Sequence, residues 1–265
     1  MKNQGTFHQP FILAVISGKG GVGKSMTSVN TAESLKRAGY RVALIDADLG
    51  LSNCATMMNE TVEASVDEWI RGDCSLEELP QNCNGLTLIT GSDEPARERF
   101  RPELYMDAMD QVILHLAADH DFIIIDTPAG IGEITLWALD RAHLGSILLV
   151  DEPTAISDVY RLCKYVYSID PEYRFGGIVN LAESEKSAGS THKRFNSILN
   201  YFLKKKTGYL GFIPESEMIR HAVKQQRTLF QDDPTSKLLD EFQFIAQNII
   251  GYAGATKKDL AKVNL

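Results

Sequence analysis

The 265-residue sequence lacks the features of secreted, membrane-spanning and multi-domain chains. Its four cysteines, Cys54, Cys74, Cys83 and Cys163, form no C-x-x-C pair, which argues against a zinc site or a secreted disulfide framework and favours reduced thiols in the cytoplasm. The first ten residues contain no apolar signal-peptide core, and no run of about 18 apolar residues is present to span a bilayer. No Pro- or Gly-rich linker, low-complexity tract or repeat divides the chain, so we expect one domain.

The sequence also has no excess of positive charge. It contains 27 Lys and Arg against 35 Asp and Glu, which gives a formal net charge of -8. Nonspecific duplex binding requires a surface that neutralises many phosphates, so nucleic acid is not an expected partner. The 44% hydrophobic and 23% charged residues are the balance of an ordinary globular protein. We expect disorder only at the ends, beginning with a flexible N-terminal segment over residues 1–10.

Short, almost continuous apolar runs recur along the chain and predict strands that are buried on both faces of a parallel sheet. These runs cover residues 11–17, 41–46, 86–90, 122–126, 146–151, 175–180 and 209–213. Segments with helical spacing lie between most of them, at 26–38, 104–118, 155–169 and 191–206, and a last helix is expected at roughly 235–250. The alternation predicts an α/β fold with a single doubly wound, mainly parallel sheet flanked by helices.

A glycine-rich turn, GKGGVGKS at residues 18–25, directly follows the first apolar run and precedes a helical segment. This is the context of a Walker A motif, in which backbone N–H groups close around the β- and γ-phosphates and the helix directs its positive end at them. Lys24 is expected to neutralise phosphate charge and Ser25 to bind Mg²⁺ directly. We therefore predict a site for ATP or ADP with Mg²⁺ that is formed by Gly18, Lys19, Gly20, Gly21, Val22, Gly23, Lys24, Ser25 and Met26.

The motif carries a second lysine, Lys19, directly after its first glycine. This marks a deviant Walker A motif, and here the sequence resembles the MinD/ParA family of dimerising P-loop NTPases. The resemblance implies that Lys19 crosses a dimer interface to contact the partner's nucleotide, so that ATP holds two subunits together. It also implies catalytic roles for Lys19 and Lys24 in slow, partner-regulated ATP hydrolysis. Without this context, a lysine in a loop is more often a solvated charge.

Two further acidic stretches resemble the family's switch regions. Asp46 ends a strand-like run and Asp48 opens the stretch DLGLSN. The resemblance implies that Asp48 orients the attacking water, that Asn53 supports the loop, and that Asp46 contacts Mg²⁺ through water. Two aspartates after a strand also commonly cap a turn.

The stretch FIIIDTPAGIG at residues 122–132 resembles the family's Walker B and switch II segments. Its four apolar residues deliver Asp126 to the carboxyl edge of the sheet, where ligands bind in such folds. Asp126 is expected to hold a Mg²⁺-bound water. Gly130 and Gly132 give the loop the backbone freedom to respond to the γ-phosphate.

The nucleoside end of the site is expected further along the chain. The resemblance implies that Asn180 reads adenine through its amide and that Pro214 and Glu215 lie beside the base and ribose. Taken alone, an Asn after a strand is commonly a turn residue. Glu152 is expected near the rim of the nucleotide site.

Segments 65–79, 151–166 and 219–237 resemble the FlhG/FleN (YlxH) branch of flagellar-number regulators, and the family resemblance spans roughly residues 10–250. The ATPase domain is therefore expected at 11–251. This branch implies a homodimer that regulates flagellar number or placement through a flagellar SRP-type GTPase, switch-complex proteins or a transcriptional regulator. The expected location is the cytoplasm, with peripheral binding at the inner face of the cell membrane or at a pole as an option.

Two departures from the branch concern partners. The ten residues before Phe11 contain no DQAxxLR-like segment, which puts stimulation of a GTPase in doubt. The tail at 252–265 is only weakly amphipathic or flexible, so membrane binding is expected to be weak or absent. The run Lys204–Lys206 is explained by the preference for cations at a helix end as well as by an anionic partner.

Two other functions remain open from the sequence. One is septum-site or chromosome and cargo positioning by a MinD/ParA-type ATPase, which the net charge and the weak tail do not favour. The other is iron-sulfur electron transfer of the nitrogenase iron protein type. No cysteine lies between Cys83 and Cys163, so the stretch after Asp126 has no ligand for such a cluster.

Overall fold

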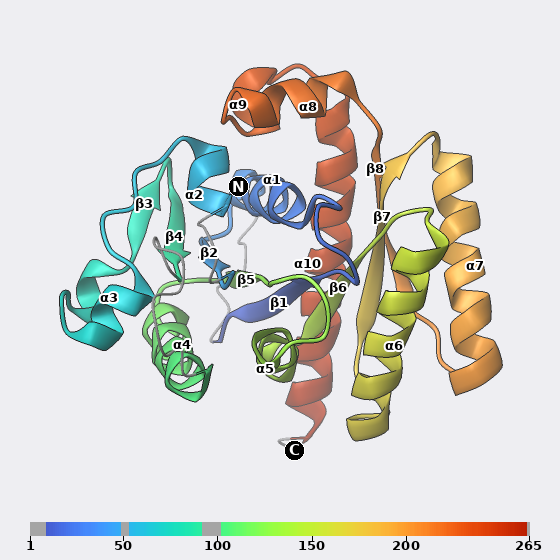
Figure 1. The fold of residues 1–265 in the computed structure, drawn as a ribbon, viewed down its shortest axis with the longest axis horizontal. Helices are drawn as coiled ribbons and strands as arrows, with labels where there is room; N and C mark the ends of the chain where they lie inside the picture. Colours follow the sequence, from blue (N-terminus) through green and yellow to red (C-terminus); the bar gives the residue numbers. More distant parts are fainter. Residues whose placement is uncertain (1–8, 49–52, 92–101, 264–265) are drawn as a thin grey trace.

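The computed structural model describes residues 9–48, 53–91 and 102–263, with side chains up to residue 256. The described chain folds around one eight-stranded sheet with the order β3-β4-β2-β5-β1-β6-β7-β8 (Figure 1). The strands are β1 (Phe11–Ile16), β2 (Val42–Asp46), β3 (Gln81–Cys83), β4 (Leu86–Thr90), β5 (Phe122–Asp126), β6 (Leu144–Leu149), β7 (Phe175–Ala182) and β8 (Gly208–Pro214). All neighbours pair in parallel except β3 with β4 at one edge. The predicted α/β fold is confirmed.

The central strands explain the continuous apolar runs of the sequence. Every residue of β1, β2, β5 and β6 is buried, because helices cover both faces of the sheet. At the carboxyl ends, Asp126 of β5 pairs in register with Asp46 of β2 on one side and with Val15 of β1 on the other. The switch residues therefore meet beside the segment that follows β1, at the edge where open α/β sheets bind ligands.

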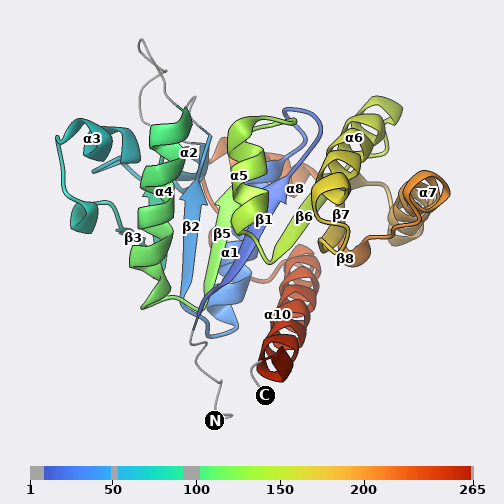
Figure 2. The same ribbon diagram turned by 90° about the horizontal axis from the view of Figure 1, so that it is seen from below.

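Helices cover the two faces in two groups, and Figure 2 shows α4, α5 and α6 on one side with α1 and α10 on the other. One hydrophobic cluster involves α3 (Val66–Arg71), α4 (Pro102–Ala117), α5 (Glu133–Arg141), α6 (Pro153–Ile169) and α7 (Glu185–Leu203). The other involves α1 (Lys24–Arg37), α2 (Asn53–Met58), α8 (Glu217–Lys224), α9 (Leu229–Asp232) and α10 (Leu238–Val263). A short 3₁₀ helix, η1 (Leu76–Glu78), precedes β3. The sheet is thus the middle layer of three.

Most expected helices differ from the observed ones by a few residues at their ends, and α7 begins six residues earlier than predicted, at Glu185. Its start is explained by a capping box, in which Ser184 and Ser187 bond to each other's backbone N–H groups. Strand β3 was not predicted, because QNC contains no apolar run; its antiparallel pairing with β4 places it at the sheet edge.

The last helix extends well beyond its predicted end near Ile250. Helix α10 continues to Val263, past the expected limit of the domain at residue 251. Gly251 and Gly254 do not end the helix, because the residues between them pack against the rest of the protein. Ala253 is buried, and Tyr252 lies so close to Gly208 that a Cβ on Gly208 would not fit. The limits of the ATPase domain and its tail stay a prediction, and residues 1–8 of the expected N-terminal segment lie outside the described chain.

Candidate functional site

The glycine-rich loop joins the end of β1 to the start of α1, where Lys24 is the first helical residue. Gly21 and Gly23 have φ angles of 74° and 92°, in the left-handed region that glycine adopts without steric strain. Gly23 also has no space for a side chain, since a Cβ would lie 2.6 Å from Nδ2 of Asn180. The glycines therefore allow both the turn and its close approach to β7.

A cavity of about 560 Å³ lies beside this loop, within the size range of small-molecule sites. It gathers residues from the loop, from both switch stretches, from β7 and from α8. The lining residues are Gly20, Gly21, Val22, Gly23, Lys24, Ser25, Met26, Asp48, Asn53, Met57, Ala129, Asn180, Leu181, Ile219, Arg220, Val223 and Lys224. Most residues predicted to bind nucleotide thus share one cavity, and their individual roles stay predictions.

Lys24 is half-buried in this cavity. Burial lowers the pKa of its amine, and the carboxylates of Asp126 and Asp48 oppose that shift. An ammonium group in such surroundings is well suited to bind phosphate oxygens, because the interaction strengthens where water is scarce.

The carboxylates of Asp46 and Asp126 are buried, with 0% and 1% of each residue exposed. Asp126 accepts hydrogen bonds from Ser25 Oγ at 2.6 Å and from Ser28 Oγ at 2.8 Å. Burial raises the pKa of Asp126, and burial together with the negative charge of Asp126 raises the pKa of Asp46 to about 7. No basic side chain in the described part of the chain hydrogen-bonds to either group.

This donor set fits Mg²⁺. The Ser25 hydroxyl and the two carboxylates supply hard oxygen atoms, and a divalent cation would offset two buried negative charges that now oppose each other. We retain the prediction that Ser25 binds the cation directly and that Asp46 and Asp126 act through water. The cation would supply charge neutralisation of the phosphates.

Lys19, the predicted dimer-crossing residue, is engaged within its own subunit. Its Nζ lies 2.8 Å from Oε2 of Glu152, and both side chains are half-exposed. Glu152 is the N-cap residue of α6, so the ion pair links the glycine-rich loop to that helix. Neither residue lines the cavity, so the predicted nucleotide contacts of Lys19 and Glu152 stay predictions.

The residues predicted for the nucleoside end do not all line the cavity. Asn180 is buried, lines the cavity and donates from Nδ2 to the carbonyl oxygen of Val22 at 2.7 Å. Pro214 and Glu215 are not among the lining residues. Glu215 instead forms an ion pair with Arg220, which does line the cavity. The predicted base and ribose contacts of Pro214 and Glu215 stay untested.

Helix α8 contributes a side of the cavity that sequence reasoning missed. Ile219, Arg220, Val223 and Lys224 all line it. A signal was present, since Arg220 and Lys224 are four residues apart on a helix that directly follows the last strand. These residues add two cations and two apolar side chains to the lining of the cavity.

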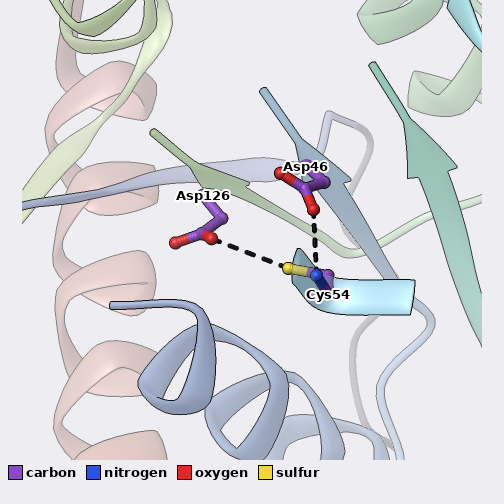
Figure 3. Close-up of side chains that lie close together, drawn as sticks. All are labelled: Asp46, Cys54 and Asp126. Atoms are coloured by element: carbon purple, nitrogen blue, oxygen red, sulfur yellow. Dashed lines mark hydrogen bonds between the residues drawn. The ribbon is translucent and has the colours of Figure 1, made fainter. Parts of the chain in front are cut away.

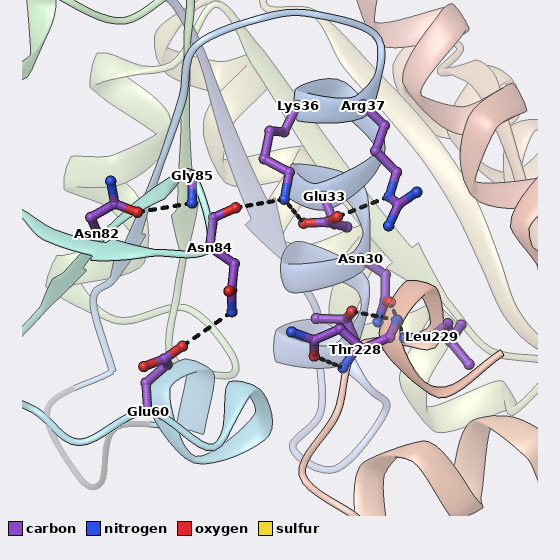
Figure 4. A network of polar contacts seen from close by, with 11 residues as sticks. Asn30, Glu33, Lys36, Arg37, Glu60, Asn82, Asn84, Gly85, Thr228 and Leu229 are labelled. Carbon is purple, nitrogen blue, oxygen red and sulfur yellow. Dashed lines mark hydrogen bonds and ion pairs between the residues drawn. The ribbon is translucent and has the colours of Figure 1, made fainter. Parts of the chain in front are cut away.

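Asn30 of α1 fixes the chain that follows α8 (Figure 4). Its Nδ2 donates to the carbonyl oxygen of Met26 at 2.9 Å, and its Oδ1 accepts from the backbone N–H of Leu229 at 2.9 Å. Leu229 is the first residue of α9, and α8 and α9 contact each other. One buried amide therefore connects α1, the helix that follows the glycine-rich loop, to α9, which contacts α8.

The loop after β5 is attached to the glycine-rich segment. The backbone N–H of Gly130 donates to the carbonyl oxygen of Ser17 at 2.9 Å, and Gly130 has a φ of 85°. Gly132 is the N-cap residue of α5. The predicted switch loop thus leads from Asp126, past the end of β1, directly into a helix.

Comparison with known proteins agrees with this geometry. Residues 9–250 match the family ParA, described as NUBPL iron-transfer P-loop NTPase. The chain is 31% identical to the antiactivator FleN of Pseudomonas aeruginosa, over 94% of this chain and 89% of FleN. It is 30% identical to the flagellum site-determining protein YlxH of Helicobacter pylori, over 88% of this chain and 80% of YlxH.

The fold is similar to that of the septum site-determining protein MinD complexed with Mg-ADP from Pyrococcus horikoshii. The TM-score is 0.74 and the sequence identity 22%, over 93% of this chain and 98% of that one. The MinD structure supports the fold, and the match over residues 9–250 supports the family. The chain therefore belongs to the ParA/MinD family of P-loop NTPases.

Proposed function

We propose that this protein is an ATP-dependent molecular switch that regulates flagellar number or placement. In this proposal ATP binding drives homodimerisation, partners bind the dimer, and slow, partner-regulated hydrolysis returns monomers. The observation that carries it is the single cavity that brings Lys24, Ser25 and Asp48 together while Lys19 lies outside it. The names of FleN and YlxH, two relatives that cover most of the chain, support the flagellar assignment.

The proposed reaction uses groups already placed in the cavity. Lys24 neutralises charge on the β- and γ-phosphates, and Asp48 orients a water whose oxygen attacks the γ-phosphorus while the bond to the bridging oxygen breaks. Lys19 leaves Glu152 and contacts the nucleotide of the partner subunit. Because Lys19 and Glu152 are half-exposed, their separation costs only about 0–1 kcal/mol.

The proposed partners are a second copy of the chain and, beyond it, a flagellar SRP-type GTPase, switch-complex proteins or a transcriptional regulator. The term antiactivator in the name of FleN supports the last of these. Within the described ranges, no helix is both long and apolar enough to cross a bilayer. We propose a cytoplasmic protein that binds peripherally, if at all, to the inner face of the cell membrane or a pole.

Light scattering with purified protein tests the switch. The wild type is expected to change from monomer to dimer on addition of ATP and Mg²⁺, and Asp48→Ala is expected to remain dimeric for longer because hydrolysis is slowed. Lys19→Ala is expected to stay monomeric. If Lys19→Ala forms dimers as well as the wild type, the dimer-crossing role of Lys19 is wrong.

A deletion strain tests the biological role. We expect an altered number or position of flagella with normally placed division septa, and complementation by the wild type but not by Lys24→Ala. Normal flagella together with misplaced septa would instead support the septum-positioning function. Unchanged flagella and septa would exclude both.

A further inference from the structure

The thiol of Cys54 lies beside the two buried carboxylates of the predicted cation site, Asp46 and Asp126 (Figure 3). Cys54, the second residue of α2, is 0% exposed. Its thiol donates to Asp126 Oδ2 at 3.6 Å, and its backbone N–H donates to Asp46 Oδ2 at 2.9 Å. One ligand atom from each of Asp46, Cys54 and Asp126 lies within 4.8 Å of the others. Within the described ranges, this is the one group of three carboxylate, thiol or imidazole ligands so close together.

The chemistry of this donor set differs from that of an all-oxygen Mg²⁺ site. Mg²⁺ takes oxygen ligands in octahedral geometry and gains little from sulfur. Cobalt, zinc and cadmium ions accept thiolate and carboxylate ligands together, and four-coordinate sites are common for zinc. The Ser25 hydroxyl, 2.6 Å from Asp126 Oδ2, supplies a fourth donor. Three side chains from β2, α2 and β5 therefore lie around one position, and Ser25 of α1 adjoins them through Asp126.

We propose that Cys54 is a cation-selecting residue, which makes this site bind a thiophilic divalent cation directly and more tightly than Mg²⁺ in the absence of nucleotide. On binding, the metal–sulfur bond forms and the thiol proton passes to solvent, while Asp46 and Asp126 bind as carboxylates. The inference rests on the proposed function only in that the same position would serve Mg²⁺ with ATP.

The cation would also have a mechanical effect on the switch. Cys54 stands six residues after Asp48, and its backbone is already bonded to Asp46. A direct metal bond to its sulfur would tie α2 to β5 and occupy the position that the ATP reaction requires. Thiophilic cations are therefore expected to compete with Mg²⁺ for this position and to hold the protein in its monomeric form.

Cobalt titration of the full-length, nucleotide-free protein tests the proposal. Wild type is expected to develop a near-ultraviolet sulfur-to-cobalt charge-transfer band that saturates at one equivalent. Cys54→Ser and Cys54→Ala are expected to lack the band. Cys74→Ser, which removes a half-buried thiol that is not part of this group, is expected to retain it. Zinc binding measured by calorimetry should be at least tenfold weaker in Cys54→Ser. A tenfold loss of affinity is the smallest effect usually seen when a group that supports a metal ligand is removed, and Cys54 is proposed to bind the metal itself.

Two results would overturn the proposal. One is a wild-type titration without a charge-transfer band, which needs no variant and so does not depend on whether Cys54→Ser folds. The other is equal zinc affinity of wild type and both Cys54 variants, with thermal melting used to show that the variants are folded. Because the titration contains no nucleotide, its outcome is separate from that of the ATP-dependent dimerisation experiment.

Discussion

In the nucleotide-free protein, Asp46→Asn is expected to increase stability at and above neutral pH. The pKa of the Asp46 carboxyl is about 7, against an ordinary 3.8, because of its burial and of the neighbouring Asp126. Between these two values the folded chain holds a proton that the unfolded chain has released. The free energy of unfolding therefore falls as the pH rises from about 4 to about 7, and the loss is complete above that window.

The magnitude follows from the size of the shift. An increase from 3.8 to about 7 corresponds to roughly 4 kcal/mol at about 1.4 kcal/mol for each pH unit. Asparagine stays neutral and so avoids this loss. The backbone N–H groups of Asp48 and Cys54 bond to different carboxylate oxygens of Asp46, and asparagine offers only one acceptor oxygen, so one N–H loses its partner at about 1–3 kcal/mol. We expect a net gain of about 1–3 kcal/mol at about pH 8, and a net loss of about 1–3 kcal/mol at about pH 4, where only the lost hydrogen bond counts.

Urea unfolding in the presence of EDTA, at several pH values between about 4 and 8, measures this difference. The matched control is Asp107→Asn, which changes an exposed carboxylate on α4 and should follow the wild-type curve. If Asp46→Asn loses stability with pH as steeply as the wild type, the buried carboxylate pair is not the source of the pH dependence.

Three further changes test other parts of the structure. Gly18→Ala is expected to destabilise the fold by about 1–3 kcal/mol, because the added Cβ would lie 2.8 Å from the backbone N of Val159. Gly20→Ala is the control, since its Cβ would have its nearest neighbour at 3.9 Å. Urea unfolding of both variants measures the difference. Glu152→Gln is expected to change the unfolding free energy by no more than about 1 kcal/mol, and a larger loss would show that its pairing with Lys19 is structural. Asn30→Ala is expected to cost about 1–3 kcal/mol of stability and to weaken ATP binding more than tripolyphosphate binding, since α8 loses its anchor. Calorimetry with both ligands checks this, and equal weakening would contradict it.

Most strands of the sheet could be predicted because a strand that is buried on both faces has a continuous apolar sequence. The segment FIIID of β5 is apolar at four successive positions, as a strand covered on both faces requires, and it ends on the carboxylate that faces the site. Strand β3 has no such pattern and exists through its pairing with β4. The extension of α10 was missed for a related reason, since the glycines at 251 and 254 weaken the local signal while Ala253 packs in the core.

The part of the cavity formed by residues 20–26 could be predicted because these residues are contiguous and belong to one motif, while their contacts to phosphate stay predictions. The α8 side of the cavity could not be predicted, because α8 is placed by tertiary contacts. Ile219 and Ala222 pack into the core, and the following helix α9 is bonded to Asn30, 199 residues away from Leu229. Cys54 is a similar case. Nothing in its neighbourhood along the chain indicates that its thiol points at Asp126, 72 residues away.

The hydrogen bond from Gly130 to Ser17 gives nucleotide occupancy a route to the outside of the molecule. A displacement of the glycine-rich loop would be passed through this hydrogen bond to the segment that starts α5, and α5 lies on the face of the sheet opposite α1 and α8. In the proposed nucleotide complex, binding of the phosphates and binding of the nucleoside would therefore affect different faces of the sheet. A protein that docks against α5 would respond to the state of the γ-phosphate, whereas one that docks against α8 would respond to whether any nucleotide is bound at all.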